Sequence, residues 1–145
     1  MRYLEKAALA GAATGLRSTS AVSALISAKA PGLPAALAGP VAAGLAGLGV
    51  TGELQQDKDP TTPSRLTAVG LGGRIAFASL AGAVLARGAK HAVLPAVIVG
   101  SAAALISARL GHDLRVAAAE HFVPSAVASA EDALVLSLAA ASARP

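Results

Sequence analysis

The chain has 145 residues, of which 54% are hydrophobic and only 14% are charged, and it contains no cysteine. This length suits one domain, 1–145, whereas a soluble domain would carry about 25% charged residues on its surface. The net charge of +4 is scattered and has few aromatic residues beside it, which argues against nucleic-acid binding, and the mean hydropathy of +0.63 favours a protein embedded in the lipid bilayer.

Charged residues divide the chain into five apolar windows of 18 to 23 residues each. A bilayer core about 30 Å thick is crossed by roughly 20 helical residues, because each residue adds about 1.5 Å. A soluble bundle would show a charged face along every helix, and residues 33–51 offer none. The sequence therefore predicts an all-α polytopic transmembrane helical bundle of four or five spans, at about 7–28, 33–51, 66–86, 92–109 and 122–143.

The connections between these spans differ in character. Residues 31–34 (PGLP) predict a tight turn that makes a hairpin of the first two spans, and 52–65 form one clearly polar loop. Residues 110–121 are expected to form a surface helix or to extend the fourth span. Pro40 falls inside the second span, where we expect a kink.

Small residues are frequent in the predicted spans, and in lipid they let helix backbones approach closely. Gly11 and Gly15 form a GxxxG step in the first span. Close helix packing and a general bias toward glycine and alanine explain each such step equally well. Further glycines are expected to thin the second and third spans, at Gly39, Gly44, Gly47, Gly49, Gly70, Gly72 and Gly73.

Orientation follows from the distribution of lysine and arginine. With five spans, the N-terminus would share one side with the loops 52–65 and 110–121, and that side would hold six Lys and Arg residues against four. The positive-inside rule then predicts a cytoplasmic N-terminus in the inner (plasma) membrane, although so small a difference also permits insertion in both orientations.

Four charged residues fall near the middle of predicted spans, and so at about one depth: Arg17, Arg74, Glu131 and Asp132. Each unpaired charge at the bilayer centre costs about 2.5–3.5 kcal/mol on insertion scales. Two positive and two negative charges cancel, and a guanidinium group fits a carboxylate well. The sequence therefore predicts that these four residues form one buried cluster, with Ser18 and Ser20 available as hydrogen-bonding groups near the first arginine.

Two functions fit such a cluster. It forms part of a pathway for an ion, a proton or a small anionic solute in a channel- or transporter-like protein, or it only fixes helix register in a non-conducting scaffold subunit of a membrane complex. A different topology, in which the last span begins after Asp132, would place both acidic residues at the membrane interface. A chain this short encloses little cavity alone, so we expect a homo-oligomer or a membrane-complex partner.

No catalytic or cofactor-binding motif is present in the sequence, so we expect neither an enzyme nor a bound cofactor. No metal site is expected either, because the candidate ligands lack an established zinc spacing and lie in a predicted surface segment. These candidates are His112, Asp113, Glu120 and His121.

Four stretches, taken in order, cover most of the chain: GAATGLRSTSAVSAL from residue 11, GELQQDKDPTTPSRL from residue 52, GGR from residue 72 and AEDALVLSLA from residue 130. Together they resemble the DUF4126 family of small bacterial integral membrane proteins, and the polar loop is the most specific part. The resemblance implies a polytopic inner-membrane protein and carries no established activity.

Overall fold

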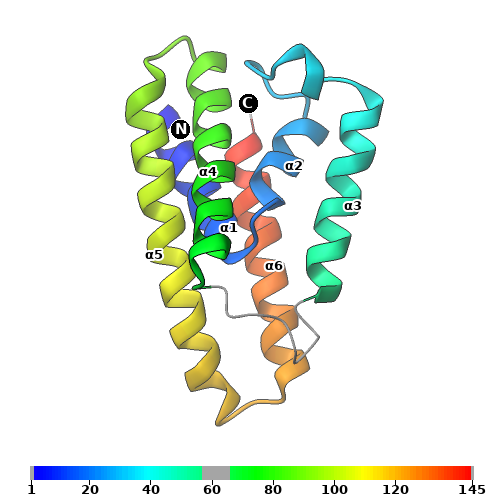
Figure 1. The fold of residues 1–145 in the computed structure, drawn as a ribbon, viewed down its shortest axis with the longest axis vertical. Helices are drawn as coiled ribbons and strands as arrows, with labels where there is room; N and C mark the ends of the chain where they lie inside the picture. Colours follow the sequence, from blue (N-terminus) through cyan, green and yellow to red (C-terminus); the bar gives the residue numbers. More distant parts are fainter. Residues whose placement is uncertain (1, 57–65, 145) are drawn as a thin grey trace.

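The computed structural model describes residues 2–56 and 66–144, and the side chains of all of these except 49–56 and 119. All regular structure in these ranges is helical, which confirms the predicted all-α class (Figure 1). The elements in chain order are α1 (Tyr3–Leu16), α2 (Ser20–Ser27), the 3-10 turn η1 (Ala35–Leu37), α3 (Pro40–Gln56), α4 (Ala68–Gly88), α5 (Val93–Ala119) and α6 (Pro124–Ala143).

Three of these helices are long and apolar enough to cross a membrane, namely Ala68–Gly88, Val93–Ala118 and Pro124–Ala143. The first and last lie close to the predicted spans. The middle one, α5, continues beyond the predicted end at residue 109, so most of 110–121 extends the fourth span. Its 27 residues give a length of about 40 Å. The fold is therefore compatible with a membrane protein, and three of the four or five predicted spans correspond to helices among the described residues that are long and apolar enough to cross a membrane.

The first predicted span, 7–28, is not one helix. It breaks after Leu16, where Arg17 has an extended backbone with φ of −143° and ψ of 119°. The residues that follow are Ser18, Thr19 and Ser20, and such side chains bond to nearby backbone groups and compete with helical hydrogen bonds. The hydroxyl of Ser20 does this, because it donates to the carbonyl of Arg17 at 2.9 Å. The prediction of a continuous first span is therefore wrong.

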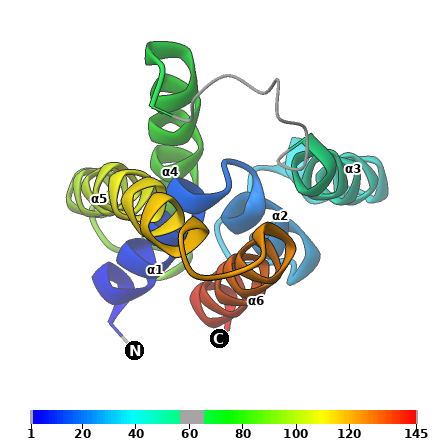
Figure 2. The same ribbon diagram turned by 90° about the horizontal axis from the view of Figure 1, so that it is seen from below.

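The two halves of this segment, α1 and α2, form a hairpin. Helix α1 runs parallel to α5, because Ala7 packs with Ala96 and a Cβ added at Gly11 would meet Gly100. After the break, α2 returns toward the end of the bundle from which α1 came (Figures 1 and 2). The turn that follows α2 packs against the last turn of α4, where Gly32 lies beside the backbone of residues 84–88.

The hairpin changes the predicted arrangement of the chain ends. Both termini and the turns 28–34 and 89–92 lie at one end of the bundle, which we call the terminal end (Figure 1). Helix α4 begins part-way toward the opposite end, the far end, and residues 120–123 connect α5 to α6 at that far end (Figure 1). The sequence placed the N-terminus on the side of the loop around 110–121. That arrangement is wrong, because a hairpin returns the chain to its starting side whereas a span does not.

Proline and glycine positions also separate into correct and incorrect predictions. Pro40 is the first residue of α3, where its missing N–H costs nothing, so the expected kink is absent. A Cβ added at Gly11 would lie 2.1 Å from the carbonyl oxygen of Gly100, so the predicted GxxxG step is a real helix contact. Among the other glycines, a Cβ would meet nothing within 4 Å at Gly39, Gly44, Gly47, Gly72 and Gly73, while Gly49 lies outside the described side chains. The predicted close packing is therefore wrong at those five positions.

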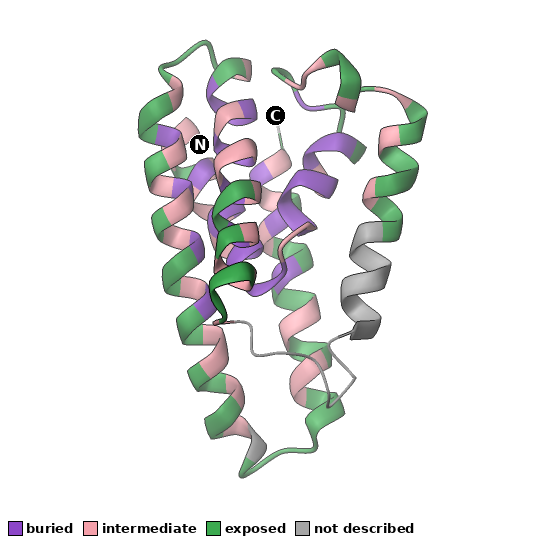
Figure 3. Ribbon diagram, in the orientation of Figure 1, coloured by how far each residue is buried: buried purple, intermediate pink, exposed green. Residues whose placement is uncertain are grey.

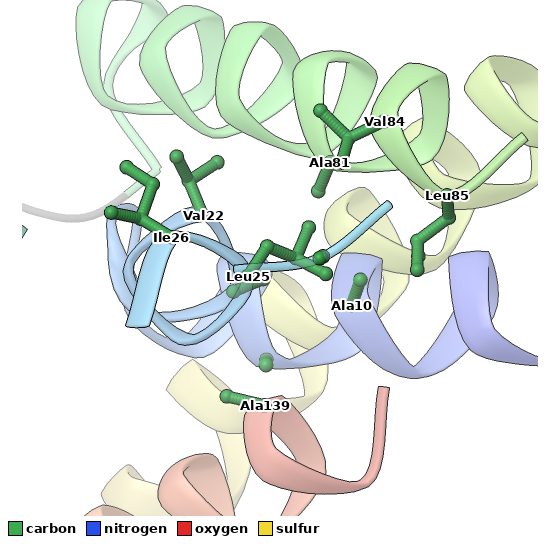
Figure 4. Close-up of a cluster of buried hydrophobic side chains, with 11 residues drawn as sticks. Ala10, Val22, Leu25, Ile26, Ala81, Val84, Leu85 and Ala139 are labelled. Carbon is green, nitrogen blue, oxygen red and sulfur yellow. The ribbon is translucent and has the colours of Figure 1, made fainter. Parts of the chain in front are cut away.

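The hairpin forms the centre of the buried core (Figure 3). Side chains from four helices meet there, including Ala10 of α1, Leu25 of α2, Val84 of α4 and Ala139 of α6 (Figure 4). Most of the core residues are alanine, whereas many leucine, isoleucine and valine side chains on the outside are more than half exposed. Soluble proteins rarely expose so much apolar surface, and close packing of small residues is typical of helices in lipid.

Candidate functional site

The tip of the hairpin places Arg17 in the interior of the bundle. Its side chain is only 4% exposed, and its guanidinium group donates a hydrogen bond to Asp132 of α6. The carboxylate of Asp132 is 24% exposed, so the ion pair reaches from the core toward the surface of the site. Residues 115 positions apart in the sequence are thereby joined at the point where α1 ends.

Arg74 of α4 approaches the same tip from another side. Its Nε atom donates to the carbonyl oxygen of Gly15 at 2.8 Å, and its Nη1 atom donates to the carbonyl of Gly70 at 3.1 Å. In an unbroken helix the Gly15 carbonyl would accept from the amide of Thr19, and the break at Arg17 removes that partner. Arg74 therefore satisfies a carbonyl group that the hairpin turn releases.

Glu131 is paired with a residue that was not among the four predicted for the cluster. Arg115 of α5 donates to its Oε2 atom from Nε, at 3.1 Å, and from Nη2. Adjacent residues on a helix point about 100° apart, which is why Glu131 faces α5 while Asp132 faces α1. Of the predicted cluster, the structure thus shows Arg17 paired with Asp132 and Arg74 joined to that pair through the hairpin backbone, while Glu131 is paired with Arg115.

Arg115 was missed because the sequence left residues 110–121 open between a surface helix and an extension of the fourth span. The sequence did contain an indication. If α5 continues beyond residue 109, Arg115 lies on this helix beside α6, at the level of the two acidic residues. The side chain of Arg115 is 31% exposed and that of Glu131 only 10%. This second pair therefore lies nearer the surface than the buried Arg17 but still protects a carboxylate from the apolar surroundings.

The predicted polar neighbours of Arg17 have mixed positions. Ser20 is buried and bonds to the Arg17 carbonyl, whereas Ser18 lies in the break and is partly exposed. Thr14 bonds back to the Ala10 carbonyl at 2.8 Å, one turn earlier in its own helix. Of these hydroxyl groups, that of Ser20 therefore stabilises the backbone of the turn.

The described side chains of the site carry three guanidinium groups and two carboxylates: Arg17, Arg74, Arg115, Glu131 and Asp132. Their local charge is positive. The first turn of α2 starts at the same tip and adds the positive end of a helix dipole. The arrangement therefore favours an anion over a cation.

The predicted ligand-type residues of 112–121 form no metal centre among the residues that the structure describes. Asp113 instead lies 3.9 Å from Arg109 on the exposed face of α5. No family model, curated protein or solved structure matches this chain. Function is therefore inferred from the hairpin and its charged residues.

Proposed function

We propose that the protein is a small multi-pass membrane protein of the inner membrane and a channel- or transporter-like conductor of a small anion. Helices α3 to α6 are the spans in this proposal, and α1 with α2 is a re-entrant hairpin that enters and leaves on one side. The observation that carries the proposal is the position of Arg17 at the tip of this hairpin, deep inside the bundle.

The register of α1 against α5 supports this depth. Gly11 lies at Gly100 and Gly15 at Ala104, a constant offset of 89 positions. The same offset places Arg17, the residue directly after α1, level with Ile106, the middle residue of the 27-residue α5. Arg17 thus lies about 20 Å from either end of α5, which is the depth of a bilayer centre.

A hairpin that ends at this depth has a recognised use in transport proteins. Broken helices near the midplane present free backbone groups and half-helix dipoles to a solute, which a continuous helix cannot do. The first turn of α2 and the guanidinium groups around it supply donors for an anion. The partial exposure of Asp132 gives the ion pair a side open to such a solute.

The alternative is a non-conducting scaffold in which the same groups fix the packing of the bundle. One observation favours it: Arg74 satisfies a backbone carbonyl of the turn, so this arginine has a structural task without any solute. The two functions differ in what Arg17 does once the protein is folded.

Chloride flux into liposomes containing the purified protein separates the two functions. We expect wild-type protein to conduct chloride and Arg17→Gln to lose most of that flux, while Arg109→Gln, which removes one exposed charge from the outer face of α5, keeps it. Circular dichroism and gel filtration establish that each variant is folded. Absence of flux with wild-type protein, or full flux in folded Arg17→Gln, would overturn the transport proposal in favour of the scaffold.

Membership of the DUF4126 family, on the four stretches quoted above, is part of the same proposal. So is a homo-oligomeric assembly, since α3 leaves apolar side chains such as Leu45 widely exposed. Cross-linking of a Leu45→Cys variant in membranes tests the assembly, because the chain has no other cysteine. A cross-linked dimer is expected if α3 lies between copies, and only monomers if lipid covers it.

We propose further that the terminal end faces the cytoplasm. It carries six lysine and arginine residues: Arg2, Lys6, Lys29, Arg87, Lys90 and Arg144. The chain has twelve lysine and arginine residues in all. Apart from these six and the buried Arg17 and Arg74, four remain, and two of the four, Lys58 and Arg65, fall between α3 and α4 in the sequence. The positive-inside rule then gives a cytoplasmic N-terminus, as predicted from the sequence but for a different grouping of the loops.

A further inference from the structure

A groove opens at the terminal end, away from the hairpin tip. Its volume is about 470 Å³, and it lies where the beginning of α1, the turn after α2, the end of α4 and the end of α6 meet. Most of its wall is apolar, including Pro31 and Leu85, and two cationic residues, Lys6 and Arg144, line it as well.

The two cationic residues are held next to each other. The Nζ atom of Lys6 donates to the backbone carbonyl of Arg144, which ties the last turn of α6 to the first turns of α1. Arg144 is exposed, so its guanidinium group is available to a ligand that approaches the groove. An apolar wall beside two adjacent cations suits a ligand that has both an anionic group and hydrocarbon.

The surrounding charge has the same sign. Six lysine and arginine residues lie at the terminal end, and Glu5 is the one acidic residue among the described residues there. This end therefore carries a charge of +5, although the whole chain carries only +4. An anionic surface is the complementary partner, and basic pockets between helices at the cytoplasmic side of a membrane bind lipid headgroups.

Two of these cations occupy backbone positions that favour glycine. Lys29 has φ of 49° and Lys90 has φ of 57°, each in the turn that follows a helix. A left-handed conformation is unfavourable for a residue with a side chain. Lysine at both positions places a cationic residue just after the C-terminal end of a helix, at the terminal end.

The depth of the groove also fits a lipid headgroup. Tyr3 lines it and stacks on His91, with 4.4 Å between the ring centroids. Tyrosine is enriched where the apolar core of a bilayer meets water. Helix α1 begins at this level and helices α4 and α6 end there, so a lipid whose phosphate group is bound there would have its acyl chains directed along the apolar outer surface.

We propose that this groove binds the headgroup of an anionic phospholipid of the surrounding membrane, with Lys6 and Arg144 contacting the phosphate. The site is separate from the hairpin tip and is independent of whether the protein conducts an ion. Free inorganic phosphate shares the anionic chemistry, but it would leave the apolar wall of the groove uncovered.

Native mass spectrometry of the full chain in detergent, with added phosphatidylglycerol or phosphatidylcholine, tests the proposal. We expect phosphatidylglycerol adducts on wild-type protein and much weaker adducts with the zwitterionic lipid. The double variant Lys6→Gln with Arg144→Gln should bind phosphatidylglycerol about 30-fold more weakly, which corresponds to about 2 kcal/mol. Arg144→Gln alone keeps the backbone bond to Lys6 and should show roughly a fivefold loss.

The matched control is Lys29→Gly with Lys90→Gly, which removes two charges from the same end outside the groove lining and suits both left-handed turns. It should retain adducts within about threefold of wild type, since its charges lie further from the phosphate. Equal losses in both double variants would overturn the groove as a site. Displacement of the lipid by millimolar inorganic phosphate would overturn its assignment to a lipid.

Discussion

The contact between α1 and α5 predicts that the same substitution, glycine to alanine, lowers the stability of the protein at one position and raises it slightly at another. Gly11 faces Gly100, and a Cβ at Gly11 would lie 2.1 Å from that carbonyl oxygen, 2.8 Å from its carbon and 2.9 Å from its Cα. All three atoms are backbone, so no side chain can move away. An ordinary van der Waals contact of a Cβ atom lies at 3.4–4 Å, so relieving this one would shift one helix by more than 1 Å.

We therefore expect Gly11→Ala to destabilise the protein by about 1–3 kcal/mol, the usual cost of overpacking. This cost exceeds the gain of about 0.5–1 kcal/mol that alanine brings in a helix interior. Gly72→Ala is the matched control, because its Cβ would meet nothing within 4 Å and only the gain remains.

Reversible unfolding in mixed detergent micelles, followed by circular dichroism, measures both changes. The free energy of unfolding should fall for Gly11→Ala and rise slightly for Gly72→Ala. A Gly11→Ala protein as stable as wild type would refute the close parallel packing of α1 on α5, and with it the depth assigned to the hairpin tip.

Three further substitutions test other parts of the structure by the same unfolding measurement. Asp132→Asn should lower the free energy of unfolding by about 2–3 kcal/mol, because it leaves Arg17, which is only 4% exposed, without its carboxylate partner. The cost is somewhat less than for a fully buried partner, because the Asp132 carboxylate is 24% exposed. Replacing both residues with apolar ones should recover part of this loss, and no recovery would count against the pair. Gly32→Ala should destabilise, since the residue has φ of 90° and a Cβ would lie 2.4 Å from a carbonyl oxygen of α4, and a neutral result would contradict the packing of the turn. Thr67→Ala should cost about 1 kcal/mol because its side chain accepts a bond from the Gly70 amide at the start of α4, whereas Thr67→Ser should be nearly neutral; equal effects would count against this cap.

The sequence predicted α4 and α6 well because charges bound mostly apolar runs there, interrupted only by Arg74 in one and by Glu131 and Asp132 in the other, and the length of such a run indicates a helix. It failed at Arg17 for a physical reason. Counting residues between charges assumes a straight helix, but the break depends on partners far away in the sequence, above all Arg74 and Asp132. Only the three hydroxyl residues after Arg17 gave a local indication.

The charged site was also predictable only in part. The costs of charges in lipid led to the expectation that Arg17 and the acidic pair meet, and the structure brings Arg17 to Asp132. The partner of Glu131 was missed, because it depends on how far α5 continues beyond residue 109, which the sequence left open. Glycine spacing was equally ambiguous, since a GxxxG step and an exposed glycine look alike until the neighbouring helix is placed.

The central claim is that α1 and α2 form a hairpin that enters and leaves the membrane on one side. Because the natural chain has no cysteine, single cysteines can be labelled without background. The variants Arg2→Cys, Lys29→Cys and Phe122→Cys, treated with a membrane-impermeant maleimide in sealed vesicles of known orientation, report the side of each position. The hairpin predicts that residues 2 and 29 are labelled from one side and residue 122 from the other. Labelling of residues 2 and 29 from opposite sides would show a continuous first span and contradict the account.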